Sequence, residues 1–247
     1  MSALQSHMRR AAAAGRITEQ VGPFLATFSP DSANPFLNYA IPDDGARPSS
    51  SDVDALTEAY AQRDLLPRVE FMAETAPAAE QALLAAGWSV ERRIPVMLCP
   101  PGSAVAIPAP AGTELVVPRT DEEIRGMLVA QYEAFGEPTD IPDAEVGKTR
   151  ERLRAGGFAV LATVSGEPAG GGVAEAIADG TTEVAGIGVR ERFRRRGIGA
   201  AMTAFLAAAV HAAGARTVFL TPAGVPEQRM YARAGFAPTG DMLHLSR

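Results

Sequence analysis

The stretch that most restricts the fold of this sequence is residues 182–200. There an apolar segment meets a turn of arginine and glycine and then a long alanine-rich segment. The apolar segment is predicted to be a strand, and Ile198–Ala213 a helix, because apolar side chains recur there every three or four residues. Gly197 and Gly199 lie at the helix start, where backbone N–H groups lack helical partners and the helix dipole is positive. This arrangement favours binding of a phosphate-like anion.

Three consecutive arginines, Arg194, Arg195 and Arg196, would add bidentate donors to such a site. A tight turn with solvated arginines is the alternative interpretation. Two other phosphate-binding motifs are excluded. A dinucleotide site needs glycine where Met202 stands, and a P-loop needs a lysine before serine or threonine in the turn itself, whereas the only lysine, Lys148, lies far from this turn.

The composition narrows the classes of function. A chain of 247 residues that is 47% hydrophobic can bury the core of one large or two modest domains. Its net charge of −6 gives no electrostatic reason to expect nucleic acid as a partner. Cys99 is the only cysteine and the three histidines have no metal-ligand spacing, so no metal is expected. No secretory signal or run of ~20 apolar residues is present, so we expect a cytoplasmic protein without a membrane partner.

The first half of the chain is predicted to begin with a short helix or frayed arm and to continue with alternating strands and helices. The strands are residues 24–28, 36–41, 69–72 and 90–99, and the helices are residues 51–63, capped by Ser51 or Asp52, and 78–86. Clustered proline and glycine make residues 101–112 a linker between units 1–100 and 113–247.

The second half is predicted to contain six strands and four helices. The strands are residues 114–117, 158–164, 168–178, 181–189, 217–220 and 236 onward, and the helices begin at the Thr120–Glu123 capping box, at Pro142, at Ile198 and at Pro226.

The arginine and glycine turn resembles a known family signature. Val189 followed by Arg194-Arg195-Arg196-Gly197-Ile198-Gly199 is similar to the R/Q-x-x-G-x-G/A turn of the GNAT N-acetyltransferase superfamily, including its spacing back to the strand valine. The order of elements in residues 113–247 is also similar. The resemblance implies an α/β (α+β) GNAT fold, with a mixed central sheet flanked by helices. It also implies acetyl-CoA as cosubstrate, and the residues implied to bind it are Ile187, Gly188, Val189, Arg194, Arg195, Arg196, Gly197, Ile198, Gly199 and Ala200.

An internal repeat links the two halves. Residues 69–88 align with residues 217–236 at a constant offset, ending in Ala-Gly-aromatic in both copies. The first copy has no arginine and glycine turn, and Leu83 stands where the second copy has Tyr231. We therefore interpret the N-terminal half as a truncated, degenerate GNAT-like half that is catalytically silent and walls in the acceptor site. A chance similarity of two strand–helix–strand units is the alternative.

The resemblance also suggests catalytic residues. Tyr231 would be the acid that protonates the leaving thiolate, although core packing is the alternative for a helical tyrosine. Glu183 would be the base, with Glu175 in reserve, and a solvated strand carboxylate is the alternative. Many relatives have an asparagine where this chain has Gly224, so a cosubstrate contact from that position is not expected. Gly186, together with Gly188, fits a bulge or a close approach of ligand, and glycines that merely relieve packing are the alternative.

The acceptor is constrained least. Tyr132, Phe135 and Glu137 lie where relatives shape the acceptor pocket, and an acidic residue there would favour a cationic amine. The sequence thus predicts an N-acetyltransferase that acetylates an amine of a small molecule or protein by direct attack in a ternary complex. No covalent intermediate is expected, because Cys99 lies in the linker region. The alternative is a non-catalytic acyl-CoA sensor on the same fold, and a monomer and a homodimer are both compatible with the sequence.

Overall fold

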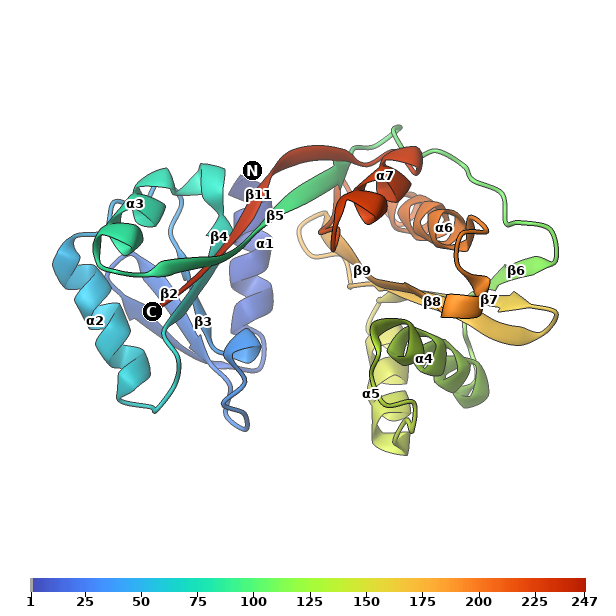
Figure 1. Cartoon of the computed structure of the whole chain (residues 1–247), viewed down its shortest axis with the longest axis horizontal. Coiled ribbons are helices and arrows are strands. Elements are labelled where there is room, and N and C mark those ends of the chain that lie inside the picture. Colours follow the sequence, from blue (N-terminus) through green and yellow to red (C-terminus); the bar gives the residue numbers. More distant parts are fainter. Residues whose placement is uncertain (1) are drawn as a thin grey trace. The chain divides into compact units, whose positions relative to one another are not determined.

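The computed structural model describes residues 2–247, which divide into two compact units (Figure 1). The first unit contains the chain up to Val96 together with Thr239–Arg247, and the second contains Met97–Pro238. The final nine residues thus cluster with the N-terminal unit, whereas the sequence placed them in the C-terminal one. The chain passes between the units within β5 (Ser89–Cys99) and again within β11 (Ala237–Ser246).

The first unit is built on a sheet with strand order β1-β2-β3-β4-β11. Pairing along it is antiparallel, antiparallel, parallel and antiparallel. Its remaining elements, in chain order, are α1 (Ser2–Ala13), β1 (Ile17–Val21), β2 (Phe24–Phe28), β3 (Tyr39–Pro42), α2 (Ser50–Ala61), β4 (Arg68–Met72) and α3 (Pro77–Ala85).

The second unit is built on a sheet with strand order β5-β10-β9-β8-β7-β6, in which β5 contributes Met97–Cys99. The β9–β10 pair is parallel and the other pairs are antiparallel. Its other elements are β6 (Thr113–Val116), α4 (Asp121–Phe135), α5 (Asp143–Arg154), β7 (Phe158–Val164), β8 (Glu167–Ala174), β9 (Thr181–Val189), α6 (Ile198–Ala212), β10 (Thr217–Leu220) and α7 (Val225–Arg233).

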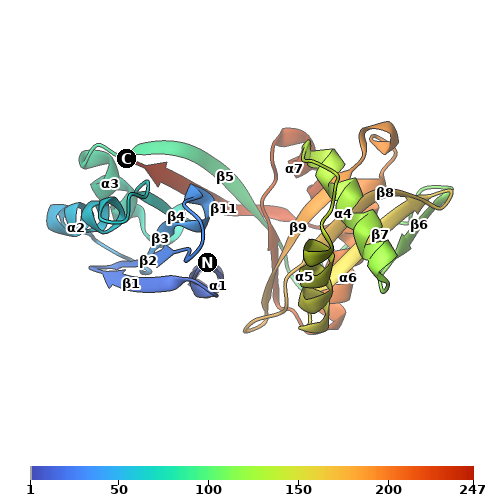
Figure 2. The ribbon, with the colours of Figure 1, turned by 90° about the horizontal axis from the view of Figure 1, so that it is seen from below.

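Two apolar clusters cover the two faces of the second sheet. One packs α4 and α5 against β7 around Ile124, Met127 and Leu161. The other packs α6 and α7 against the opposite face and includes Met202 and Tyr231. Figure 2 shows α4 and α5 crossing in front of this sheet, with α6 behind it. The mixed sheet flanked by helices confirms the predicted fold class.

The internal repeat has a structural counterpart. Helices α3 and α7 begin at residues 77 and 225 and end at residues 85 and 233, so both ends keep the same offset. The strands that follow begin at residues 89 and 237, again with that offset. The order of pair orientations in the first sheet is also the order that joins β7, β8, β9, β10 and β5 in the second.

Several predicted boundaries were wrong for local reasons. Residues 36–41 are not one strand, because Asn34 caps a short 3-10 turn over Pro35–Leu37 before β3 begins. Ser49, rather than Ser51 or Asp52, caps α2. Strand β8 ends at Ala174, four residues early, where a turn leads into β9. The edge strand β1 was missed, because its side chains are mostly exposed and carry little apolar pattern.

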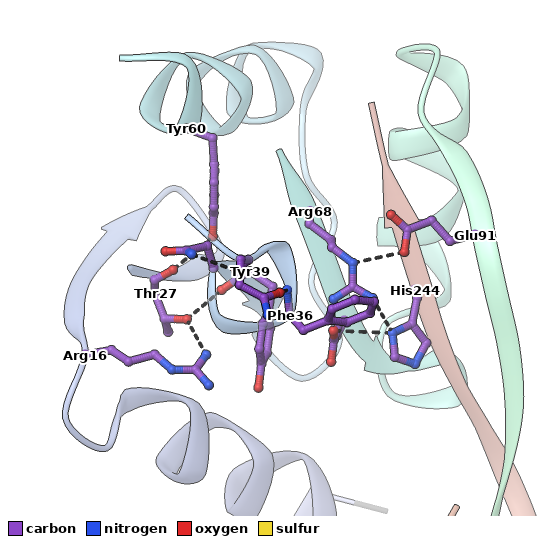
Figure 3. Close-up of polar contacts among 11 residues, drawn as sticks. Arg16, Thr27, Phe36, Tyr39, Tyr60, Arg68, Glu91 and His244 are labelled. Carbon is purple, nitrogen blue, oxygen red and sulfur yellow. Dashed lines mark hydrogen bonds and ion pairs between the residues drawn. The ribbon is translucent and has the colours of Figure 1, made fainter. Parts of the chain in front are cut away.

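A buried charge cluster holds β11 in the first unit (Figure 3). The Arg68 side chain is 1% exposed and forms ion pairs with Glu70 and, at 2.9 Å, with Glu91. Its Nη2 donates to His244 Nδ1 on β11 at 2.9 Å. Burial, followed by the charge of Arg68, lowers the pKa of His244 to about 4, so the ring is neutral and its Nδ1 can accept.

Candidate active site

The site begins with an opening beside β9. Strand β10 pairs with β9 only at Thr181, Thr182 and Glu183, so no ladder joins β10 to residues 184–189 in the described chain. On the other side of β9, Gly171 pairs with Gly188 but Val173 pairs with Ala185, which leaves one extra residue on β9. This is a β-bulge, and it forms where Gly186 adopts a φ of +63°. The bulge predicted for the strand glycines is therefore present at Gly186.

Helix α4 packs closely over the bulge. A Cβ atom at Gly188 would lie 3.0 Å from Ala134 Cβ and 3.4 Å from Phe135 Cε2, so the second glycine serves a close helix approach. The buried side chain of Gln131 donates from Nε2 to the Gly186 carbonyl oxygen at 2.7 Å. Gln131 therefore fixes the carbonyl that the bulge turns out of the ladder.

The predicted anion-binding turn has open backbone donors. Gly197 is the N-cap residue of α6, with a φ of +91° and no side-chain capping bond. The first helical hydrogen bond runs from the Ala201 N–H to the Gly197 carbonyl at 3.1 Å, so the N–H groups of residues 198–200 have no acceptor within the helix. Arg195 has a φ of +60°, also in the left-handed region. Turns of this kind, with adjacent N–H groups at a helix start, bind anions.

The three arginines of the turn differ in what they contact. Arg194 donates from Nε to the Val189 carbonyl at 2.9 Å and from Nη2 to the Ala134 carbonyl at 2.8 Å, so it ties the turn to β9 and α4. Arg196 donates to the Arg192 carbonyl at 3.2 Å and lies over the Phe193 ring. Arg195 is exposed and its guanidinium has no ion-pair or hydrogen-bond partner among residues 2–247. Of the three, Arg195 is therefore the most available to an anion.

Met230 of α7 lies beside this turn, and Tyr231 follows it in the same helix. A Cβ atom at Gly199 would lie 2.7 Å from Met230 Sδ and 3.7 Å from Val189 Cγ2, so β9, α6 and α7 meet at Gly199. Tyr231 is buried in the apolar cluster that packs α6 and α7 against the sheet, with its ring centroid 6.4 Å from that of Phe236. Burial, and then the charge of Glu227, raises the pKa of Tyr231 to about 12. Its hydroxyl therefore keeps its proton at neutral pH.

Glu183 is a carboxyl group with altered acidity. It lies at the last β9–β10 pair, opposite Phe219. Burial raises its pKa to about 7, and the neighbouring Glu175 carboxylate adds to the shift. The two residues are adjacent across β8 and β9, since the Glu175 N–H donates to the Glu183 carbonyl at 3.1 Å. A carboxyl group with this pKa can accept or release a proton near neutral pH.

A pocket of about 240 Å³ lies between α4, α5 and the β7–β8 pair. Tyr132, predicted to shape the acceptor site, lines it, as do Gln131 and Glu175. The other two predicted acceptor residues lie elsewhere. Phe135 is exposed beside Gly188, and Glu137 is exposed past the end of α4, where its N–H donates to the Tyr132 carbonyl at 2.8 Å.

The comparisons with known proteins agree with this geometry. Residues 122–236 match the model of the acetyltransferase (GNAT) family. Because this match lies within the second unit, Met97–Pro238, we call that unit the GNAT domain.

Solved structures extend the similarity beyond the GNAT domain. A GCN5-related N-acetyltransferase from Kribbella flavida superposes with a TM-score of 0.83 at 27% identity, over 99% of this chain and 94% of that one. A GCN5-related N-acetyltransferase from Sphaerobacter thermophilus superposes with a TM-score of 0.69 at 18% identity, over 93% of this chain and 82% of that one. A tandem GNAT protein from the clavulanic acid biosynthesis pathway superposes with a TM-score of 0.66 at 15% identity, over 91% of this chain and 78% of that one. At the identities of these last two structures, the similarity concerns the fold alone. No curated protein matches in sequence.

Some residues of the GNAT domain site were not found from sequence. Gln131 contacts the bulge from a helix 55 positions earlier, and no local pattern marks it. Glu145, Thr149 and Arg152 line the pocket from α5. Their spacing of four and three residues places them on one helix face, which is a signal that sequence could have offered.

Cys99 is the last residue of β5, as the predicted strand 90–99 had it, and the statement that it lies in the linker region was wrong. It pairs with Val218 of β10 and is fully buried in the core of the GNAT domain. Burial raises the pKa of its thiol, which disfavours the nucleophilic thiolate.

Within residues 2–247, no group of three or more His, Cys, Asp or Glu side chains could hold a metal ion. No helix in this range is long and apolar enough to cross a membrane.

Proposed function

We propose that the GNAT domain is an acyltransferase that uses acetyl-CoA and transfers the acetyl group to an amine. The observation that carries this proposal is the uncapped start of α6 at Gly197, next to the part of β9 that no β10 ladder covers. Open N–H groups at residues 198–200 and the free guanidinium of Arg195 fit the pyrophosphate of coenzyme A. The unpaired edge of Ile187–Val189 fits the amide groups of its pantetheine arm.

The donor supplies its acetyl group as a thioester, in which the acceptor nitrogen replaces sulfur as the carbon–sulfur bond breaks. Tyr231 holds a proton at its hydroxyl and would give it to the leaving sulfur. Glu183 would take the proton that the amine loses, since its pKa of about 7 leaves much of it ionised at neutral pH. A backbone N–H of Ile187–Val189 would polarise the thioester carbonyl.

The test of the donor site is calorimetric titration with acetyl-CoA. Gly197→Asp puts a carboxylate where the anion would bind and should abolish binding. Gly214→Asp is the matched control, because Gly214 also has a left-handed φ, of +98°, and lies just past the other end of α6 with no atom within 4 Å of its added Cβ. Equal loss in both variants, or no binding by the wild type, would refute the donor site.

A non-catalytic acyl-CoA sensor on the same fold is the second candidate. A tyrosine that keeps its proton and a carboxyl group that titrates near neutral pH are features of a catalytic site and not requirements of a binding protein. Release of free thiol from acetyl-CoA in the presence of amines separates the two candidates. A protein that binds acetyl-CoA and turns over no amine in a broad panel would be a sensor.

We further propose that the first unit is a degenerate GNAT-like half that does not bind the donor. Its helix α2 occupies the place in the repeat that α6 has in the GNAT domain. The α2 start is capped by Ser49 and by Asp52, whose carboxylate accepts from the Ser49 N–H at 2.8 Å. A carboxylate already at this helix start opposes a second anion.

In the first unit, β3 and β4 correspond to β9 and β10, and a side chain bridges the place where they are not paired. These strands share a single pair, Ala40 with Val69. Fully buried Gln5 of α1 donates to the Pro42 carbonyl at 3.0 Å and accepts from the Met72 N–H at 3.1 Å, so one amide bridges the two strand ends. We expect one acetyl-CoA per chain, removed by Gly197→Asp, and a second site remaining in that variant would overturn the assignment.

A further inference from the structure

The pocket under α4 and α5 is lined by charged side chains that have no ion pair within the described part of the chain. Glu145, Arg152 and Glu175 all line it. Among residues 2–247, no ion pair or hydrogen bond engages any of these three side chains. Other arginines on the same two helices are paired, Arg125 with Asp143 and Arg150 with Asp121 at 2.6 Å. Arg152 differs from these two arginines because no carboxylate among the described residues holds its guanidinium.

The positions of these charges define what could bind between them. Glu145, Thr149 and Arg152 lie on one face of α5, so Glu145 and Arg152 are separated by about 10 Å along the helix axis. Arg152 and Glu175 lie at the same end. A Cβ atom at Gly157 would be 2.9 Å from the Arg152 carbonyl oxygen and 3.5 Å from that of Ala174, the residue before Glu175. Because both residues line the pocket, this end of it has a cationic and an anionic side chain.

The same end borders the proposed reaction centre. Glu175 is the cross-strand neighbour of Glu183, so both side chains project on the sheet face that carries Val173 and α4. Gln131 lines the pocket and also holds the Gly186 carbonyl in the β9 bulge. A molecule in the pocket would therefore have its Glu175 end next to the proposed base.

The pocket is small and partly apolar. Its volume of about 240 Å³ is below the roughly 300–1,000 Å³ of pockets that enclose drug-sized ligands. Leu128, Leu153 and Val173 supply apolar wall, and the hydroxyls of Tyr132 and Thr149 supply hydrogen-bonding groups. These dimensions suit a small molecule better than a protein side chain presented on a folded surface.

We propose that the acceptor is a small zwitterionic amine, whose ammonium lies at Glu175 and whose adjacent anionic group, carboxylate or phosphate, lies at Arg152. An α-amino acid has this arrangement, and so has an aminoalkyl phosphate. Arg152 gives the bidentate geometry that either anion prefers, and Glu175 favours the cationic form before the proton is lost. This inference rests on the proposed function and names the substrate class of its acceptor site.

The experiment compares matched amines in the acetyl-CoA-dependent thiol-release assay and by calorimetric binding. Each α-amino acid is paired with its carboxamide, and aminoalkyl phosphates are tested against the corresponding amino alcohols. The wild type should prefer the anionic member of each pair by at least about tenfold in kcat/KM. A larger preference in the phosphate series or in the amino acid series identifies the anion.

Arg152→Met should remove this preference by weakening only the anionic substrates, while the carboxamides and amino alcohols keep their rates. Arg150→Met is the matched control, since Arg150 lies on the same helix but is engaged by Asp121, and it should keep the preference. Binding of acetyl-CoA, measured separately, reports on the proposed function itself. If the donor binds but the wild type shows no preference for anionic amines, or if Arg152→Met keeps the preference, the zwitterion assignment is wrong while the transferase proposal stands.

Discussion

Replacing Glu183 by glutamine tests the altered acidity of the proposed base through the stability of the protein. The carboxyl pKa is raised from 4.5 to about 7 in the folded protein, chiefly by burial. A carboxyl group whose pKa is higher in the folded state holds a proton that the unfolded chain has already lost. The free energy of unfolding therefore falls as pH rises from about 4.5 through 7, and glutamine, which cannot ionise, removes this loss.

The size of the effect follows from the two pKa values. A difference of about 2.5 pKa units at about 1.4 kcal/mol each gives a penalty on the order of 3 kcal/mol above pH 7. Most of it, about 2–3 kcal/mol, develops between pH 5 and pH 8. Wild type and Glu183→Gln should thus have similar stability near pH 5, and the variant should be the more stable protein at pH 8.

The assay is urea unfolding followed by circular dichroism at pH 5, 6, 7 and 8. The only tryptophan, Trp88, is buried in the first unit, so its fluorescence reports separately on a unit that the substitution does not touch. Glu175→Gln is the control. This substitution removes the Glu175 charge, the smaller cause of the raised Glu183 pKa, so most of the pH dependence of stability should remain.

Two results would refute this reasoning. A stability difference between wild type and Glu183→Gln that stays within about 0.5 kcal/mol from pH 5 to pH 8 would mean that the carboxyl is not buried in the folded protein. If Glu175→Gln removed as much of the pH dependence of stability as Glu183→Gln, repulsion between the two carboxylates, and not burial, would be the main cause of the raised Glu183 pKa.

Three further substitutions, one of them with a matched control, test other parts of the structure. Tyr231→Phe should lower turnover by at least about tenfold with acetyl-CoA affinity kept, and unchanged turnover would exclude the acid role. Gly186→Ala should destabilise the GNAT domain by about 1–3 kcal/mol, because φ is +63° and the methyl group would lie 2.7 Å from a glutamine amide nitrogen. Gly166→Ala, with φ of +80° and no atom nearby, should cost less in the same urea titration. Arg68→Met leaves two carboxylates without their cation and should destabilise the first unit by about 3–5 kcal/mol, and a Trp88 fluorescence midpoint that does not move would contradict this.

Local patterns in the sequence were sufficient for most of the second unit. The Thr120–Glu123 capping box begins α4 as predicted, with both reciprocal hydrogen bonds present. The apolar spacing after Ile198 predicted α6 to within one residue. These features could be read because capping, helix periodicity and turn chemistry involve groups a few residues apart.

The repeat shows both what sequence reasoning can do and where it stops. The constant offset correctly aligned α3 with α7 and the strands on either side of them. It could not predict that residues 239–247 would cluster with the first unit, where β11 pairs with β4. Strand pairing depends on partners far apart in the chain, and two similar strands offer the sequence no means of choosing between sheets.

The site divides along the same line. The sequence by itself determined the strand, the glycine turn and the helix start that could receive an anion, because a helix leaves its first N–H groups unpaired wherever it forms. Only the tertiary structure decided which groups meet that turn. Among the described residues, it committed Arg194 to backbone carbonyls and gave Arg195 no partner, placed Gln131 against the bulge, and gathered unpaired charges from α5 and from the residue after β8 in one pocket. The pKa of Glu183 belongs with these, since burial is a property of the packed protein that no neighbour in the sequence supplies.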